Sequence, residues 1–207
     1  MNKLKYIAAV AIAIAGFGLQ QAKADFNSTL NVGNDSLTGA GFFGPYGTVN
    51  VSLSGDTATI TFTALNSFSF GGAQAVDVEV NGAFTTGTIT ENGAGTFSFA
   101  GSNQVDGFGV FNLTIDASDG RPDSATFVQF TITANSPGQW SDASQVLAFN
   151  SGGGNGPAFD AAAHIFAPGV TGFAGESPAG VPDGGTTVML LGAALGALGV
   201  ARRFLKC

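Results

Sequence analysis

Apolar and polar residues alternate along most of the middle of the chain. In the segment TVNVSLSGDTATITFTA, residues 48–64, every second side chain is apolar on both sides of Ser54-Gly55-Asp56-Thr57. A period of two is the spacing of a strand that buries one face, and Gly with Asp at the centre is typical of a tight turn. The segment therefore predicts a β-hairpin.

Five further runs have the same character, each rich in Val, Ile, Phe or Thr and bounded by Gly, Asn or Asp. They are AVDVEVNG (75–82), GTFSFAG (95–101), VFNLTIDASDG (110–120), SATFVQFTITA (124–134) and AAHIFA (162–167). Short strands at this spacing predict an all-β fold, an antiparallel β-sandwich or jelly-roll. Before the tail only SDASQVLAFN suggests a helix, of one or two turns, with Ser141 or Asp142 as its cap.

Two stretches interrupt the strand pattern. NSGGGNGP (150–157) predicts a surface loop, and APGVTGFAGESPAG (167–180) is too rich in Gly and Pro for a regular element, so it predicts a linker. We accordingly place the folded domain at residues 25–173 and the linker at 174–180. A single cysteine, Cys207, excludes an intramolecular disulfide and leaves packing to stabilise the domain.

Charge is distributed unevenly along the chain. Six of the seven Lys and Arg residues lie in the terminal segments, so residues 25–181 contain thirteen acids and one base, Arg121, a formal charge of −12. A domain of this charge repels phosphate backbones and anionic lipid. Nucleic-acid binding is therefore excluded.

The first 24 residues have the three parts of a secretory signal peptide. Lys3 and Lys5 form a basic start, residues 6–19 are apolar, and Ala22-Lys23-Ala24 offers the small residues that signal peptidase requires. We predict cleavage after Ala24, so that the exported chain begins at Asp25. The alternatives are an uncleaved anchor and a buried helix.

The C-terminal segment predicts a transmembrane helix. Residues 186–201 are sixteen uncharged residues, about 24 Å of helix, enough for a thin bilayer. Arg202, Arg203 and Lys206 follow and stop transfer on the cytoplasmic side. Cys207 then lies in the cytoplasm, as a lipidation point or an unmodified thiol.

A short motif precedes this helix: Val181, Pro182, Asp183, Gly184 and Gly185. One interpretation is that Asp183 simply caps the helix. The order of motif, apolar helix and basic tip, however, resembles the PEP-CTERM family of exosortase-processed tails, in particular its VPDSG variant, with Gly184 where that variant has Ser.

The domain also resembles those that commonly precede such tails. The resemblance rests on Trp140, residues 141–144, Val146 and Leu147, residues 162–165 and residues 171–173. It implies a Gram-negative protein that signal peptidase and an exosortase process. It further implies a transient inner-membrane anchor, then delivery to the cell surface or to the exopolysaccharide matrix of a biofilm, with exopolysaccharide as a partner.

No catalytic residues are indicated, and we expect no enzymatic activity. His164 is the only histidine and lies in an apolar run, which favours a structural, hydrogen-bonded side chain near Asp160. No GxSxG motif occurs, and a pair of glycosidase carboxylates is not visible in one sequence. Tyr46 and Trp140 are the rings larger or more polar than Phe that could stack on sugar.

A calcium site is the remaining chemical hypothesis. Asp116, Asp119 and Asp123 share one loop, with Asn112 upstream, and oxygen ligands suit a hard cation. The alternative is a solvated hairpin loop, because Asp and Gly are common in turns. The sequence thus predicts a non-enzymatic exported protein without a cofactor unless Ca²⁺ binds, and the alternative function is a secreted carbohydrate- or calcium-binding adhesin module.

Overall fold

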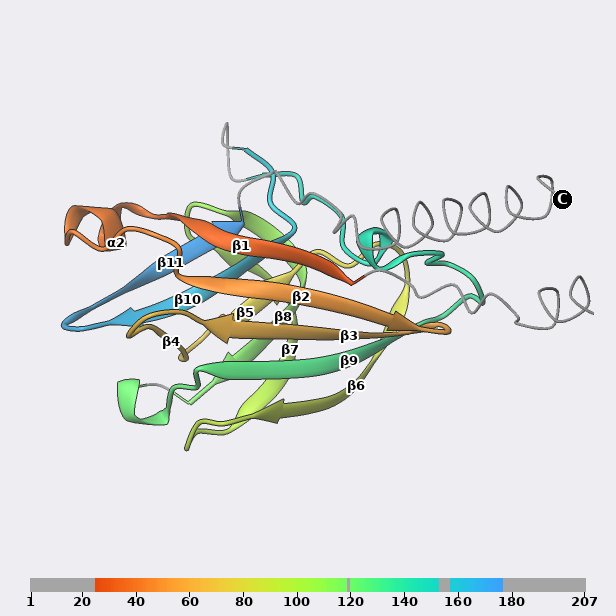
Figure 1. Ribbon diagram of the computed structural model, residues 1–207, viewed down its shortest axis with the longest axis horizontal. Coiled ribbons are helices and arrows are strands. Elements are labelled where there is room, and N and C mark those ends of the chain that lie inside the picture. Colours follow the sequence, from red (N-terminus) through yellow and green to blue (C-terminus); the bar gives the residue numbers. More distant parts are fainter. Residues whose placement is uncertain (1–24, 119, 153–156, 177–207) are drawn as a thin grey trace, which may run out of the picture.

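The computed structural model describes residues 25–118, 120–152 and 157–176 (Figure 1). This part of the chain is almost entirely strand and loop. Its strands are β1 (Phe26–Gly33), β2 (Gly47–Ser54), β3 (Thr57–Ala64), β4 (Ser69–Phe70), β5 (Val76–Val78), β6 (Phe84–Glu91), β7 (Phe97–Val105), β8 (Gly109–Ala117), β9 (Phe127–Ala134), β10 (Ala161–Ala167) and β11 (Val170–Glu176). Three short helices complete it: α2 (Asp35–Gly39), η1 (Arg121–Asp123) and η2 (Ala143–Gln145).

All the strands belong to one antiparallel sheet. The order is β6-β9-β3-β2-β1-β11-β10-β5-β8-β7, with β4 paired to β10. The sheet curls until its two end strands, β6 and β7, lie in contact (Figure 1), so the domain is nearly barrel-shaped. The prediction of an antiparallel all-β fold is confirmed.

The arrangement differs from the predicted sandwich or jelly-roll because β1 and β11 join its two halves. Without these strands, β6-β9-β3-β2 and β10-β5-β8-β7 would be separate sheets, as in a sandwich. β1 pairs with β2 on one side and with β11 on the other. Neither β1 nor β11 was among the strands expected from the sequence, so the continuity of the sheet was not foreseen.

The predicted hairpin is confirmed as β2 and β3. Their register pairs Ser54 with Thr57 across a two-residue turn. Gly55 has a φ of 60°, the left-handed conformation that such a turn requires at its first position. The apolar residues of the alternation face the core and are fully buried, among them Val49, Val51, Ile60 and Phe62.

The prediction that residues 167–180 hold no regular element is wrong for the described part, because β11 extends to Glu176, beyond the predicted domain boundary at residue 173. The misleading residues are glycines that close packing requires. A Cβ at Gly172 would lie 2.8 Å from Leu37 Cγ of α2, and one at Gly175 would overlap the ring of Phe108. Residues 177–180 lie outside the described part.

We expect Gly175→Ala to destabilise the domain. The added methyl group forces the Phe108 ring from its site, and overpacking of this kind costs about 1–3 kcal/mol. Denaturant unfolding followed by the fluorescence of Trp140, the single tryptophan, measures the change. Gly39→Ala is the control, since nothing lies within 4 Å of its added Cβ. Equal stability of Gly175→Ala and the wild type would show that β11 does not pack against Phe108.

The edge strands β6 and β7 are both irregular. The register of β6 against β9 shifts between Thr86 and Ile89, and that of β7 against β8 shifts twice around Gly101. Bulges twist an edge away from the flat geometry that another strand needs for pairing. The two free edges of the sheet are therefore poor templates for strand addition.

The short helix predicted near Trp140 is confirmed as η2. Asp142 is its N-cap, and its carboxylate accepts a hydrogen bond from Ser144 N at 2.9 Å. The Trp140 indole donates to the carbonyl oxygen of Asn81 at 2.8 Å and its side chain is buried. Helices α2 and η1 were not predicted.

Candidate functional site

The calcium candidates that the structure describes lie on different elements. Asp116 lies in β8, where its Oδ1 accepts from Gln74 N at 2.8 Å, and Asp123 ends η1. The Asn112 side chain bonds the backbone of Val80 instead: its Oδ1 accepts from Val80 N and its Nδ2 donates to Val80 O, both at 2.8 Å. Asp119 lies outside the described residues. Within residues 25–118, 120–152 and 157–176, no three His, Cys, Asp or Glu side chains form a group that could hold a metal, and calcium binding stays a prediction.

His164 occupies the position of a structural side chain. Its Nδ1 lies 3.2 Å from the carbonyl oxygen of Ala73, and its ring stacks on Phe173 with centroids 4.6 Å apart. Phe166 lies on the other side at 5.1 Å. These contacts are those expected of a histidine that supports packing between β10 and β11.

A second apolar cluster covers the outer face of the sheet over β10. Its buried members are Val105, Phe108, Phe111, Phe159 and Ala162. The rings of Phe108 and Phe159 meet edge to face at 4.8 Å. Asn150 fixes the covering loop, because its side chain bonds Phe108 O at 2.8 Å and Phe159 N at 3.0 Å.

Asp77 is buried on this covered side of the sheet. It pairs with Ala162 of the second cluster in the register of β5 and β10, and it is 1 % exposed. Its Oδ1 accepts from the Thr114 hydroxyl at 2.5 Å, whereas its Oδ2 has no hydrogen-bond partner in the described part of the chain. Burial raises the pKa of Asp77 to about 8, the Thr114 bond opposes this, and the charge of Asp116 adds to it.

Two more acids near Asp77 have raised pKa values. Burial raises the pKa of Asp160 to about 6, against hydrogen bonds from the backbone at Asp160 and Ala161. Burial also raises the pKa of Glu79, although the backbone N–H of Asn112 donates to it. The sequence analysis predicted AVDVEVNG as a strand but gave no sign that Asp77 is buried.

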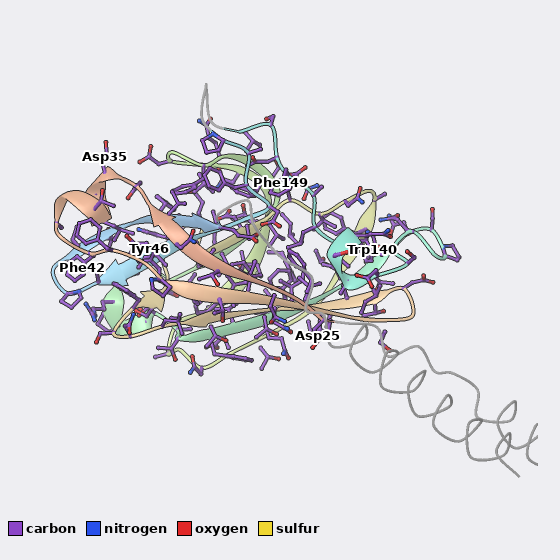
Figure 2. The ribbon with its side chains drawn as sticks, turned by 45° about the horizontal axis from the view of Figure 1, so that its top comes forward. Asp25, Asp35, Phe42, Tyr46, Trp140 and Phe149 are labelled. Atoms are coloured by element: carbon purple, nitrogen blue, oxygen red, sulfur yellow. The ribbon has the colours of Figure 1, made fainter. Side chains whose placement is uncertain are left out.

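The two rings considered for sugar stacking are not available at the surface. Tyr46 is 0 % exposed and Trp140 is 1 % exposed. Figure 2 shows Tyr46 beside Phe42 at the end that carries α2, and Trp140 at the opposite end. Among the described residues, the exposed phenylalanine rings are Phe43 and Phe149, at 69 % and 56 %. The sequence pattern did not distinguish them from core phenylalanines.

The residues of the predicted targeting segments lie outside the described part of the chain. They are Ala22 and Ala24, the motif Val181–Gly185, the helix 186–201, and Arg202, Arg203 and Lys206. In the described residues, no helix has the length and hydropathy to cross a bilayer.

An all-β domain followed by a short tail with a motif, an apolar run and a basic tip defines a class of protein, those exported and then sorted through their C-terminus. Residues 180–204 match the family of the VPDSG-CTERM motif. The chain therefore carries a PEP-CTERM-type exosortase sorting signal, as the resemblance of the tail implied. Such a signal suggests export to the cell surface. No curated protein and no solved structure matches the chain.

Proposed function

We propose that this is a non-enzymatic protein of the cell surface or the exopolysaccharide matrix of a Gram-negative bacterium. Signal peptidase removes residues 1–24, the helix 186–201 holds the chain in the inner membrane, and an exosortase cuts near Val181–Gly185. The observation that carries the proposal is the match of residues 180–204 to the sorting motif.

The positions of the first and last strands support two processing events around one domain. β1 begins at Phe26, directly after the predicted signal-peptide cleavage. β11 ends at Glu176, and Val181 follows five residues later. Five extended residues span at most about 18 Å, so exosortase would cut close to the folded domain.

The buried groups support a non-enzymatic role. Asp77 and Asp160, two acids whose pKa values burial raises, are 1 % and 5 % exposed. A carboxyl group this deeply buried is not presented to a substrate at the surface. Their burial agrees with a domain whose delivery, rather than a reaction, is its function.

Transfer of the tail to another exported protein tests the proposal. In the native host, a reporter that carries residues 1–24 at its N-terminus and residues 177–207 at its C-terminus is expected in the surface or matrix fraction, without residues 186–207. The matched control lacks only residues 181–185 and is expected to stay full-length in the inner membrane. Equal distribution of the two reporters would contradict sorting through the motif.

A further inference from the structure

A groove lies beside Phe43 at the end of the domain that carries α2. Its volume is about 430 Å³, and its walls come from the loops that follow α2 and β3 and from the turn between β10 and β11. The lining residues are Gly41, Phe42, Phe43, Asn66, Ser67, Phe68 and Pro168. None of them carries a charge, although the domain as a whole has a formal charge of −12.

Hydrogen bonds and ring contacts on the side of the core hold the loop that carries Phe43. The Tyr46 hydroxyl donates to Phe42 O at 2.7 Å, and the Asn66 side chain donates to Pro45 O at 3.3 Å. The ring of Phe68 packs on Tyr46, with centroids 5.2 Å apart, and on Phe42 at 6.1 Å. Tyr46 thus supports an exposed ring rather than offering its own, and a partner need not order this loop on binding.

The groove and the start of β1 lie toward opposite ends of the sheet. β11 is antiparallel to β1, so the chain leaves Glu176 in the direction of Phe26, where β1 begins. α2 follows the other end of β1 (Figure 1), and the loop after α2 provides Gly41, Phe42 and Phe43 of the groove lining.

We propose that this groove binds an uncharged polysaccharide chain, with Phe43 as the ring on which a sugar stacks; the inference rests on the proposed delivery to the exopolysaccharide matrix. The C–H face of a sugar is apolar and packs on an aromatic ring, and its hydroxyl groups bond amides and hydroxyls such as those of Asn66 and Ser67. The acidic domain repels a polyanion. Arg121, the only base of the domain, already donates to Ser67 O at 3.1 Å.

Affinity electrophoresis of the full-length protein in detergent tests the inference, with dextran, hydroxyethyl cellulose or the uronate polymer alginate embedded in the native gel. We expect retardation by at least one neutral polymer. Phe43→Ala should weaken it roughly five- to tenfold, the loss of one aromatic contact. Phe43→Tyr, which keeps an aromatic ring at this position, should be retarded like the wild type. Phe149→Ala, at an exposed ring outside the groove lining, is the matched control and should bind like the wild type.

Each other result overturns the inference. Retardation by neither neutral polymer, or by alginate alone, excludes the proposed ligand class, and equal binding by Phe43→Ala and Phe149→Ala excludes the groove. A dimer in sedimentation that Phe43→Ala abolishes would assign the groove to a second copy of the chain. The proposed function is checked separately, because Phe43→Ala should reach the surface or matrix fraction with its tail removed whether or not the groove binds sugar.

Discussion

Asp77→Asn should make the protein more stable above pH 8 and leave its stability near pH 4 almost unchanged. The pKa of Asp77 is raised from 3.8 to about 8 by burial, so the folded state binds the proton more tightly than the unfolded state. The contribution of Asp77 to the free energy of unfolding is fully present below pH 3.8. It is lost as the pH rises to about 8, the pKa of Asp77 in the folded state. Asparagine resembles the protonated acid and keeps an oxygen for the Thr114 hydroxyl, so its stability does not follow this loss.

The expected gain at pH 8 and above is large. A tenfold difference in proton affinity corresponds to about 1.4 kcal/mol, which places the upper limit for Asp77→Asn on the order of 5 kcal/mol. Urea unfolding from pH 4 to pH 9, followed by Trp140 fluorescence, measures it. Asp35→Asn, at an exposed carboxylate, is the control and should follow the wild-type curve. Parallel curves for Asp77→Asn and the wild type would mean that Asp77 is not buried as a neutral acid.

Changing Pro182 and Asp183 together to alanine should abolish removal of the tail. Proline favours an extended chain ahead of the predicted helix 186–201, and we expect the glycines that follow to give a protease access to the backbone. Both positions lie beyond the last strand, which ends at Glu176, so export and folding should be unaffected. Immunoblots of fractionated cells should show the full-length form accumulating in the inner membrane and little in the surface or matrix fraction.

The matched control for this double variant is the change of Ser177 and Pro178 to alanine. It alters a Pro-containing pair between β11 and the motif and should be processed like the wild type. Normal processing of the Pro182 and Asp183 variant would reduce the motif to a helix cap. Impaired processing of both variants would instead assign the effect to the backbone stiffness that proline gives the segment after β11.

The sequence predicted strands correctly where apolar and polar residues alternate regularly. It did not predict β11, whose residues are determined by packing against distant segments. β2, β3, β8 and β9 carry apolar residues at every second position, and each was expected. β11 contains Gly172 and Gly175, which resemble linker residues until Leu37 and Phe108 are seen against them. Those contacts are between distant segments, and no local pattern encodes them.

The candidate sites also differ in whether a local sequence pattern encodes them. The sorting signal is a linear motif, so residues 180–204 could be recognised without any fold. The groove beside Phe43 combines three loops that only the folded sheet brings together. Asp77 likewise lies against distant segments, since its partner in the sheet is Ala162 of the second cluster and its carboxylate accepts from Thr114.

The pairing of β1 with β11 determines when the domain can complete its fold. β1 is the first strand of the domain to be synthesised and β11 is the last, and together they join the two halves of the sheet. Contacts at such long sequence separation form late in folding. A chain that crosses the membrane from its N-terminus therefore cannot close the sheet until Glu176 has emerged on the far side. The predicted helix 186–201 would stop translocation soon afterwards, so the proposed export route has the new protein fold while it is still tethered.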